Sequence, residues 1–314
     1  MFDSLKIGFA AVAMLGVAQA QPVARPAPVR SPAHEDVVVQ GTTPLQQALS
    51  QVGEAKAPTG TLSYPYGVSV DSNSNVYVTN LFGGVNVYNP TNKYKLSGSI
   101  SVGVSSPTAV AISFGGTIYV ANNSGLNISI YDGAYNNIGS ITDPALGNPV
   151  SMSIDADDTL WVLDAQGVLH SYLSNGTIVT PETVGGTSVA PWGPYVTVWG
   201  ISRNGSYDEE YGGRAQSVHD GIFLYGDYSA GSPKTGAVAQ DQYGQQYVTD
   251  IANNVVQVWN KQGSFKVGTF STPAQGFGIA VDTKLNRVYV AYTSLNEVYV
   301  YSTAPGYKLI SVIH

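Results

Sequence analysis

The sequence contains no cysteine among its 314 residues. Disulfides, thiolate metal sites, a cysteine nucleophile and lipid attachment through a cysteine are therefore excluded. Without covalent cross-links, the fold must be stabilised by packing alone.

Charge is also scarce. Only 11% of the residues are charged, and 21 acidic against 14 basic side chains give a formal net charge of −7. Because nucleic-acid binding depends mainly on Lys and Arg that neutralise phosphates, we expect no nucleic-acid partner. The 35 Gly and 21 Tyr residues are, in contrast, typical of an all-β chain with many turns.

The first twenty residues have the pattern of a secretory signal. Lys6 supplies a positive charge, residues 7–17 form an apolar core, and Ala18-Gln19-Ala20 is a cleavage pattern of small residues. The apolar run is short for a bilayer span. We expect an exported protein, periplasmic or extracellular, with residues 1–20 as the signal peptide and no membrane span after cleavage; an uncleaved anchor is the alternative.

Residues 21–60 form a Pro/Ala-rich linker that contains a short predicted helix. Thr43 can cap this helix, Pro44 suits its first turn, and Gln46 stands three residues after the cap. We expect the helix to dock on the following domain through an apolar stripe of Leu45, Ala48, Leu49 and Val52.

Residues 61–314 repeat with a period near forty. A proline opens each unit, with spacings of 42, 42, 42, 42 and 40 residues. Such a period, with several strands in each unit, is typical of a β-propeller. The six openers are Pro65, Pro107, Pro149, Pro191, Pro233 and Pro273.

Each unit contains short alternating segments that predict strands. In the first unit these are residues 67–71, 75–80 and 85–89, followed by an outer strand at 96–102. Small residues in the first strands suit a crowded axis, and Tyr or Trp in the second and third strands would fill the space between blades. The sequence therefore predicts an all-β, six-bladed β-propeller of four-stranded blades.

The units share the pattern Pro-x-Gly-Val-x-Val-Asp, then x-Val-Tyr-Val-x-Asn/Asp, then Val-x-Val-Tyr/Trp. This pattern resembles NHL-repeat six-bladed propellers and their gluconolactonase-like and lyase-like relatives, and it covers residues 61–314. The resemblance implies the fold more than the function, because these propellers include binding platforms, lyases, lactonases and structural modules. The lactonase-like enzymes would have a Glu/Asn/Asp metal set, but no Glu stands on a predicted inner strand here.

The fourth unit departs from the pattern. Its first strand is predicted at residues 195–199 and its outer strand at 222–228, but residues 202–220 match no strand of the other units. A stretch that breaks a repeat's local rule is where function is expected. Its titratable residues are Arg203, Asp208, Glu209, Glu210, Arg214, His219 and Asp220.

Three interpretations of this stretch stay open. Asp208, Glu209 and Asp220 could bind Ca²⁺ or another divalent cation, although no metal-loop spacing is present. Glu210 or His219 could act as a general acid or base, with an arginine, Arg203 or Arg214, holding an anionic ligand. The third interpretation is a solvated charged loop without a specific role.

A second set of candidates lies on one predicted face of the propeller. Amide, carboxylate and aromatic side chains end the second strands, and neighbouring loops add aromatic residues that suit stacking on a sugar or peptide. Asn and Asp at such turns can instead bind local backbone. The candidates are Tyr64, Tyr66, Asn80, Phe82, Asn122, Asp164, Trp192, Asp250 and Tyr292.

The sequence thus favours an exported binding module, monomeric, that recognises a small molecule, a glycan or a protein partner through this loop face. No chemistry is assigned to it. A lyase- or lactonase-type enzyme that uses the fourth unit and a structural module of a cell-surface assembly are the alternatives. No cofactor is predicted, although a divalent cation stays open as an alternative.

Overall fold

The computed structural model describes residues 44–52, 60–174, 176–183, 186–192, 195–202, 205–212, 219–225, 235–260, 266–303 and 305–314. Within residues 186–225 it describes the strands but not their side chains. The predicted signal peptide and most of the linker lie outside the described residues.

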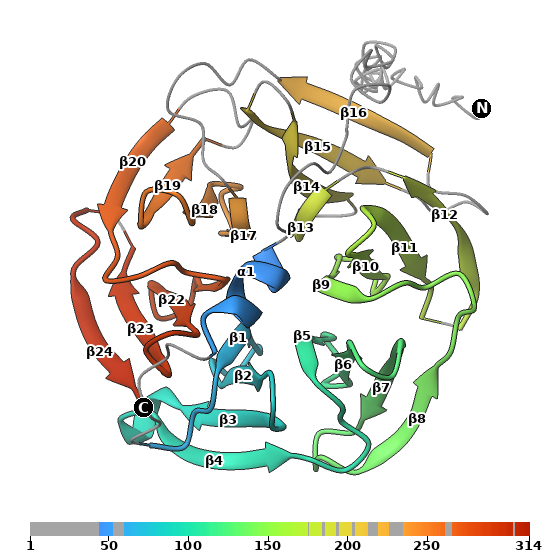
Figure 1. Ribbon diagram of the computed structural model, residues 1–314, viewed down its shortest axis with the longest axis horizontal. Helices are drawn as coiled ribbons and strands as arrows, with labels where there is room; N and C mark the ends of the chain where they lie inside the picture. Colours follow the sequence, from blue (N-terminus) through green and yellow to red (C-terminus); the bar gives the residue numbers. More distant parts are fainter. Residues whose placement is uncertain are drawn as a thin grey trace, which may run out of the picture.

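Six four-stranded antiparallel sheets, each built from four consecutive strands, surround a common axis (Figure 1). The first strands, nearest the axis, are β1 (Pro65–Val70), β5 (Pro107–Ile112), β9 (Pro149–Ile154), β13 (Gly186–Trp192), β17 (Thr235–Gln240) and β21 (Gly278–Asp282). The second strands are β2 (Val76–Asn80), β6 (Ile118–Asn122), β10 (Leu160–Asp164), β14 (Tyr195–Ser202), β18 (Gln246–Asp250) and β22 (Arg287–Tyr292). The third strands are β3 (Val85–Asn89), β7 (Asn127–Tyr131), β11 (Val168–Tyr172), β15 (Gly205–Gly212), β19 (Val255–Trp259) and β23 (Glu297–Ser302). The outer strands are β4 (Lys95–Ile100), β8 (Asn137–Ile141), β12 (Ile178–Thr183), β16 (His219–Tyr225), β20 (Lys266–Ser271) and β24 (Leu309–Ile313). The described residues also include a helix, α1 (Pro44–Ser50), and a 3₁₀ turn at Pro90–Asn92.

The prediction of an all-β propeller with four-stranded blades is confirmed. Five of the sheets have described side chains and form blades with buried cores. The remaining sheet, β13–β16, is described by its backbone, and its first strand lies beside β9 and β17.

The predicted first strand of the fourth unit was wrong, whereas the predicted outer strand at 222–228 overlaps β16 (His219–Tyr225). Residues 195–199 belong to the second strand, β14, because a preceding strand, β13, ends only at Trp192. Pro191, expected to open the unit, therefore lies near the end of a strand. The stretch 202–220 is not one loop, since β15 occupies Gly205–Gly212 and pairs with both neighbours. β13, β15 and β16 lack the strand patterns of the other units, and the Val-Thr-Val-Trp segment of β14 was taken for the first strand.

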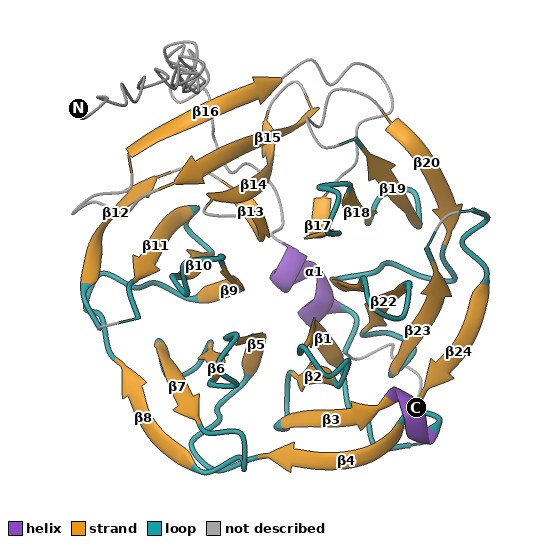
Figure 2. Ribbon diagram, turned by 180° about the vertical axis from the view of Figure 1, so that it is seen from behind, coloured by secondary structure: helices purple, strands orange, loops and turns teal. Residues whose placement is uncertain are grey.

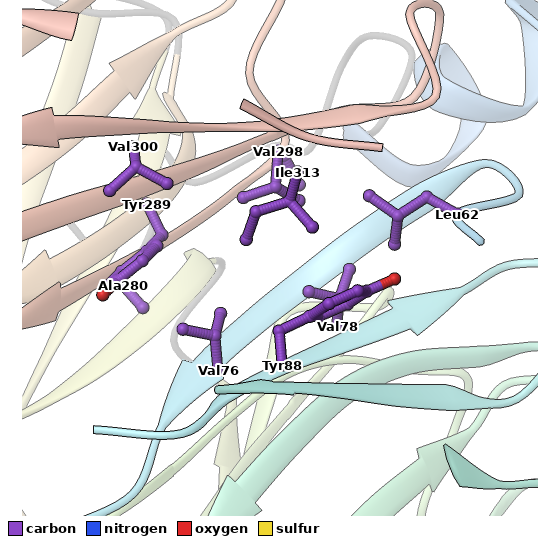
Figure 3. Packing of buried hydrophobic residues seen from close by; sticks show 10 residues of the cluster. Leu62, Val76, Val78, Tyr88, Ala280, Tyr289, Val298, Val300 and Ile313 are labelled. Carbon is purple, nitrogen blue, oxygen red and sulfur yellow. The ribbon is translucent and has the colours of Figure 1, made fainter. Parts of the chain in front are cut away.

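Buried apolar side chains fill the space between adjacent blades. Figure 3 shows the packing between the last and first blades, where Tyr289 and Val300 meet Val76 and Tyr88, with Ile313 beside them. Burying a side chain of this size contributes roughly 1.5–3 kcal/mol. Because no residue is cross-linked, these inter-blade layers are the main source of stability.

The first and last blades are each built from four consecutive strands, so no strand from one end of the chain completes the blade at the other end. The Thr61 amide donates to the carbonyl oxygen of His314 at 3.0 Å, and Asn86 Nδ2 donates to the Thr61 carbonyl at 2.8 Å. Leu62 then packs in the same apolar cluster as Ile313. The first and last blades are therefore joined by packing and by these hydrogen bonds.

Aspartates stabilise the turns between the first and second strands. Asp155 Oδ1 accepts from the amides of Asp157 and Thr159, each at 2.9 Å, and Oδ2 accepts from Trp161 Nε1 at 2.8 Å. Asp71 repeats the arrangement in the first blade. A side chain that bonds backbone two residues on is the usual way in which Asp stabilises a turn.

Candidate functional site

Helix α1 closes one end of the central channel. In both ribbon views the helix lies over the middle of the ring (Figures 1 and 2). Leu45 and Ala48 are buried against Tyr66, in the first strand of the first blade, and Phe277, just before the first strand of the last blade. The docking expected from the apolar stripe is thus present, although Leu49 stays 40% exposed.

Polar contacts hold the same helix. Gln47 Nε2 donates to Gln275 Oε1 at 3.0 Å, and Gln51 Nε2 donates to the same oxygen. Gln275 precedes Phe277 in the loop before β21, so this one loop contacts α1 through both an amide and an aromatic ring. The helix is therefore anchored to the propeller by an apolar seal and a glutamine cluster.

The helix covers part of the face predicted to bind a ligand. Tyr66 is only 4% exposed and stacks on Phe277, with ring centroids 6.0 Å apart. Burial raises the pKa of Tyr66 well above the usual tyrosine range. Tyr64 and Phe82 lie at the edge of this face in a T-shaped pair, and Phe82 is 60% exposed.

The polar residues that end the second strands make internal hydrogen bonds. Asn80 Oδ1 accepts from the Ser63 amide at 2.8 Å. Asn122 Oδ1 accepts from the Ser105 amide at 2.9 Å, and its Nδ2 donates to Ser129 Oγ at 2.8 Å. Both amides are almost fully buried. This geometry favours the turn-stabilising role for them.

The same holds for the carboxylates and the tyrosine at these strand ends. Asp250 accepts from Gln257 Nε2 at 2.9 Å, and the Tyr292 hydroxyl lies 3.1 Å from that of Tyr301. Tyr292 is fully buried, and burial raises its pKa. These predicted ligand-binding residues are brought to one face, but their polar atoms are used inside the protein.

Asp164 belongs to a buried cluster that sequence reasoning did not single out. Its Oδ2 lies 3.2 Å from His170 Nε2, while Asp143 Oδ2 lies 3.6 Å from the Nδ1 of the same imidazole. The Tyr172 hydroxyl donates to Asp143 at 3.1 Å. His170 occupies the third-strand position held by Ser129 in the preceding blade, so the cluster ties the β8–β9 loop to the blade.

The fourth-unit candidates cannot be placed as side chains. Trp192, Asp208, Glu209, Glu210, His219 and Asp220 lie in strands described only by their backbone, and Arg203 and Arg214 lie outside the described residues. Among the side chains that are described, no three His, Asp or Glu gather in a group that could hold a metal ion. In the same part of the chain no helix is long and apolar enough to cross a membrane.

The channel widens away from α1. Directly beneath the helix it holds a cavity of about 60 Å³, lined in part by Tyr66, Thr108 and Phe277. Further along, the same first strands enclose about 390 Å³ that reaches the opposite face. Val68, Val110, Met152, Val238 and Ile279 line both spaces. The channel is therefore blocked at one end and open at the other, and we call its wide end the open mouth.

The open mouth combines apolar walls with a polar rim. The described walls are aliphatic side chains of the first strands, and the rim is formed by the turns that follow these strands. Phe114, in one such turn, is 72% exposed and lines the mouth. Tyr243, in another, is 73% exposed beside a neighbouring cavity of about 240 Å³.

One carboxylate at the open mouth has an unused oxygen. Asp282 is 4% exposed; its Oδ1 accepts from the amides of Lys284 and Leu285, but its buried Oδ2 has no hydrogen-bond partner. In the first blade, Asp71 Oδ2 accepts from the Tyr77 hydroxyl at 3.3 Å. The two turns differ in length. Val281 pairs with Val288, seven residues on, whereas Val70 pairs with Val76, six residues on, so the turn after Asp282 is one residue longer.

The sequence contained a signal for this site that the repeat pattern concealed. The turn after each first strand is polar in most units, yet Phe114 and Tyr243 stand there without any turn geometry that requires a ring. The turn after Asp282 also has an extra residue. Comparing turns between units, as well as strands, would have pointed to the open mouth.

No family model matches the chain, and no curated protein matches it in sequence. Solved structures do resemble it. A gluconolactonase from Xanthomonas campestris has a TM-score of 0.61 at 11% identity, covering 76% of this chain and 86% of that one. Virginiamycin B lyase from Staphylococcus aureus has a TM-score of 0.56 at 12% identity, covering 79% and 84%. A chain of a nidogen/laminin complex has a TM-score of 0.61 at 13% identity, covering 74% and 91%.

These neighbours include enzymes and a component of a protein complex, so their functions differ while the architecture is shared. At 11–13% identity the likeness concerns the fold alone. The chain is a β-propeller with four-stranded blades.

Proposed function

We propose that this protein is an exported six-bladed β-propeller that binds a small ligand at the open mouth of its central channel. The sheet β13–β16 would be the sixth blade, because it lies between β9 and β17 and has the same strand order as the others. Export rests on the signal pattern of residues 1–20.

The observation that carries the proposal is the blind-ended channel. A concave, largely apolar space of about 390 Å³ with a few polar groups at its rim has the size and character of a small-molecule site. At the other end, α1 and the buried pair Tyr66–Phe277 occupy the equivalent position. Binding is therefore proposed on the face opposite to the one that the sequence favoured.

Calorimetric titration with octanol tests the proposal. Octanol should bind saturably to the wild-type protein, because the aliphatic walls exclude water from its chain. Ile112→Trp, which places a ring in the mouth, should abolish the heat of binding. Ser72→Trp should do the same from the exposed rim, where the substitution does not disturb the blade core.

Ile138→Trp is the matched control. Ile138 is 59% exposed on the outer strand β8, far from the axis, so the same ring there should leave octanol binding unchanged. Equal loss of binding in the control and the mouth variants would overturn the proposal. So would octanol binding that survives both Ile112→Trp and Ser72→Trp.

The enzyme alternative depends on Glu210 and His219 of the fourth unit. Their side chains lie outside the described ones. We therefore propose a binding function without assigning a reaction.

A further inference from the structure

We propose that the open mouth selects ligands that join an apolar body to a protonated amine, with Asp282 as the anchor of the amine. This inference rests on the proposed function and specifies the class of ligand. It is argued from the walls of the mouth, the unused carboxylate oxygen and the charges of the surrounding turns.

The walls determine the body of the ligand. Val70, Ile112, Ile154 and Val281 are partly exposed aliphatic side chains that line the mouth together with Met152. A ligand with a hydrocarbon body would remove this surface from water, at roughly 25 cal/mol per Å². A fully polar ligand would instead lose hydration without gaining partners.

Asp282 determines the polar end. A buried carboxylate oxygen without a donor is unfavourable, and a donor that reaches it is worth more than an ordinary hydrogen bond because the acceptor is charged. The tyrosine that would supply this donor, Tyr289, has its hydroxyl 3.5 Å from that of Tyr94. Asp282 Oδ2 is thus left without a donor among the described residues, and the ammonium group of a ligand in the mouth can supply one with compensating charge.

The charged residues around the mouth also favour a cationic ligand. The basic Arg287 donates to the backbone carbonyls of Leu285 and Asn286 within its own turn, at 2.9 and 3.1 Å. Lys284 is exposed. Among the described residues that line the mouth, the carboxylates of Asp71 and Asp282 outnumber the single cation, Lys284. A cationic head group is therefore attracted to the mouth and an anionic one repelled.

Titration of the full chain with octylamine, octanol and octanoate tests the inference. The three probes share one hydrocarbon body and differ in charge. Octylamine should bind roughly tenfold more tightly than octanol, as expected for one charge-assisted hydrogen bond, and octanoate should bind most weakly. Asp282→Asn should remove the preference for octylamine and leave octanol binding unchanged.

Asp282→Asn suits this test because Asn keeps the oxygen that accepts from Lys284 and Leu285. Asp282→Ser, which retains a turn-capping oxygen, serves as a second variant. Asp157→Asn changes the net charge equally at an exposed position that does not line the mouth.

The outcomes separate the two proposals. Loss of the amine preference in Asp282→Asn, with its retention in Asp157→Asn, supports the inference. Equal binding of all three probes, or equal effects of the two variants, overturns it and leaves ligand binding at the mouth in place. Binding of none of the probes overturns the proposed function itself.

Discussion

Tyr94 and Tyr289 join the first blade to the last. Their rings meet edge to face with centroids 6.0 Å apart and an interplanar angle of 74°, and their hydroxyl oxygens lie 3.5 Å apart. Tyr94 adopts a left-handed backbone conformation at φ 56° in the turn before β4. The turn residue Tyr307 has the same handedness and lies against Gly268 of the preceding blade. The ring is thus closed by a contact of the kind that joins its successive blades.

Removal of this contact should destabilise the protein. Tyr289 is fully buried, so Tyr289→Ala leaves a cavity between blades and should lower the free energy of unfolding by about 3–5 kcal/mol. Urea denaturation measures this. Tyr243→Ala, at a residue 73% exposed, is the control and should change the free energy of unfolding by less than about 0.5 kcal/mol. Similar losses in both variants would mean that the closing contact is not stabilising.

The turn aspartates should contribute according to their burial. Asp155→Ala removes the acceptor for two backbone amides and for Trp161 Nε1, and should cost about 2–3 kcal/mol of unfolding free energy. Asp132 accepts from the amides of Ala134 and Asn136 in the same pattern but is solvated. Asp132→Ala should therefore have the smaller effect in the same denaturation experiment, and a larger one would contradict this account.

Alkaline pH should weaken the fold through the buried tyrosines. Desolvation raises the pKa of Tyr289 and of Tyr292 above about 10, the value in the unfolded chain. The folded state therefore keeps protons that the unfolded state releases. Stability should be constant below pH 9 and fall above pH 10, by up to about 1.4 kcal/mol per pH unit for each such tyrosine. Urea midpoints from pH 8 to 11 measure this, and Tyr289→Phe should give a shallower decline.

Helix α1 should detach without unfolding the propeller. Ala48, on the propeller-facing side of the helix, is fully buried, and Ala48→Glu would place a charge in the apolar contact with Tyr66 and Phe277. Amide hydrogen exchange should then show loss of protection in α1 while the inner strands stay protected. Ser50→Glu, on the exposed side, should leave α1 protected. Loss of protection in both variants would show that the seal does not hold the helix.

Much of the fold followed from the sequence, since three of the regularly spaced prolines, Pro65, Pro107 and Pro149, are the first residues of β1, β5 and β9. Pro273 instead stands in the loop before β21, and Pro233 lies outside the described residues. The fourth unit was misassigned because its regularly spaced proline, Pro191, stands near the end of β13 and not at the start of a strand. Helix α1 was predictable from its cap and stripe, but its position over the channel depends on residues more than two hundred positions away, such as Gln275.

The candidate site was harder to predict for a physical reason. Asn122 and Asp250 are polar residues at strand ends, and sequence does not distinguish one that faces a ligand from one that bonds its own turn. The open mouth is lined by residues such as Val70 and Ile112, which resemble core residues in composition. Only the arrangement of the blades around the central axis shows that the first strands, which carry these residues, line a cavity.

The most direct test of ligand binding at the open mouth is the methyl resonance of Met152. The chain has 3 methionines, and Met152 lines both parts of the channel while Met1 and Met14 belong to the first twenty residues. With methyl-labelled methionine, and Met152→Leu to assign the signal, titration with octylamine should shift the Met152 resonance saturably, and Ile112→Trp should abolish the shift. An unchanged Met152 resonance at octylamine concentrations that saturate the calorimetric signal would contradict binding in the channel.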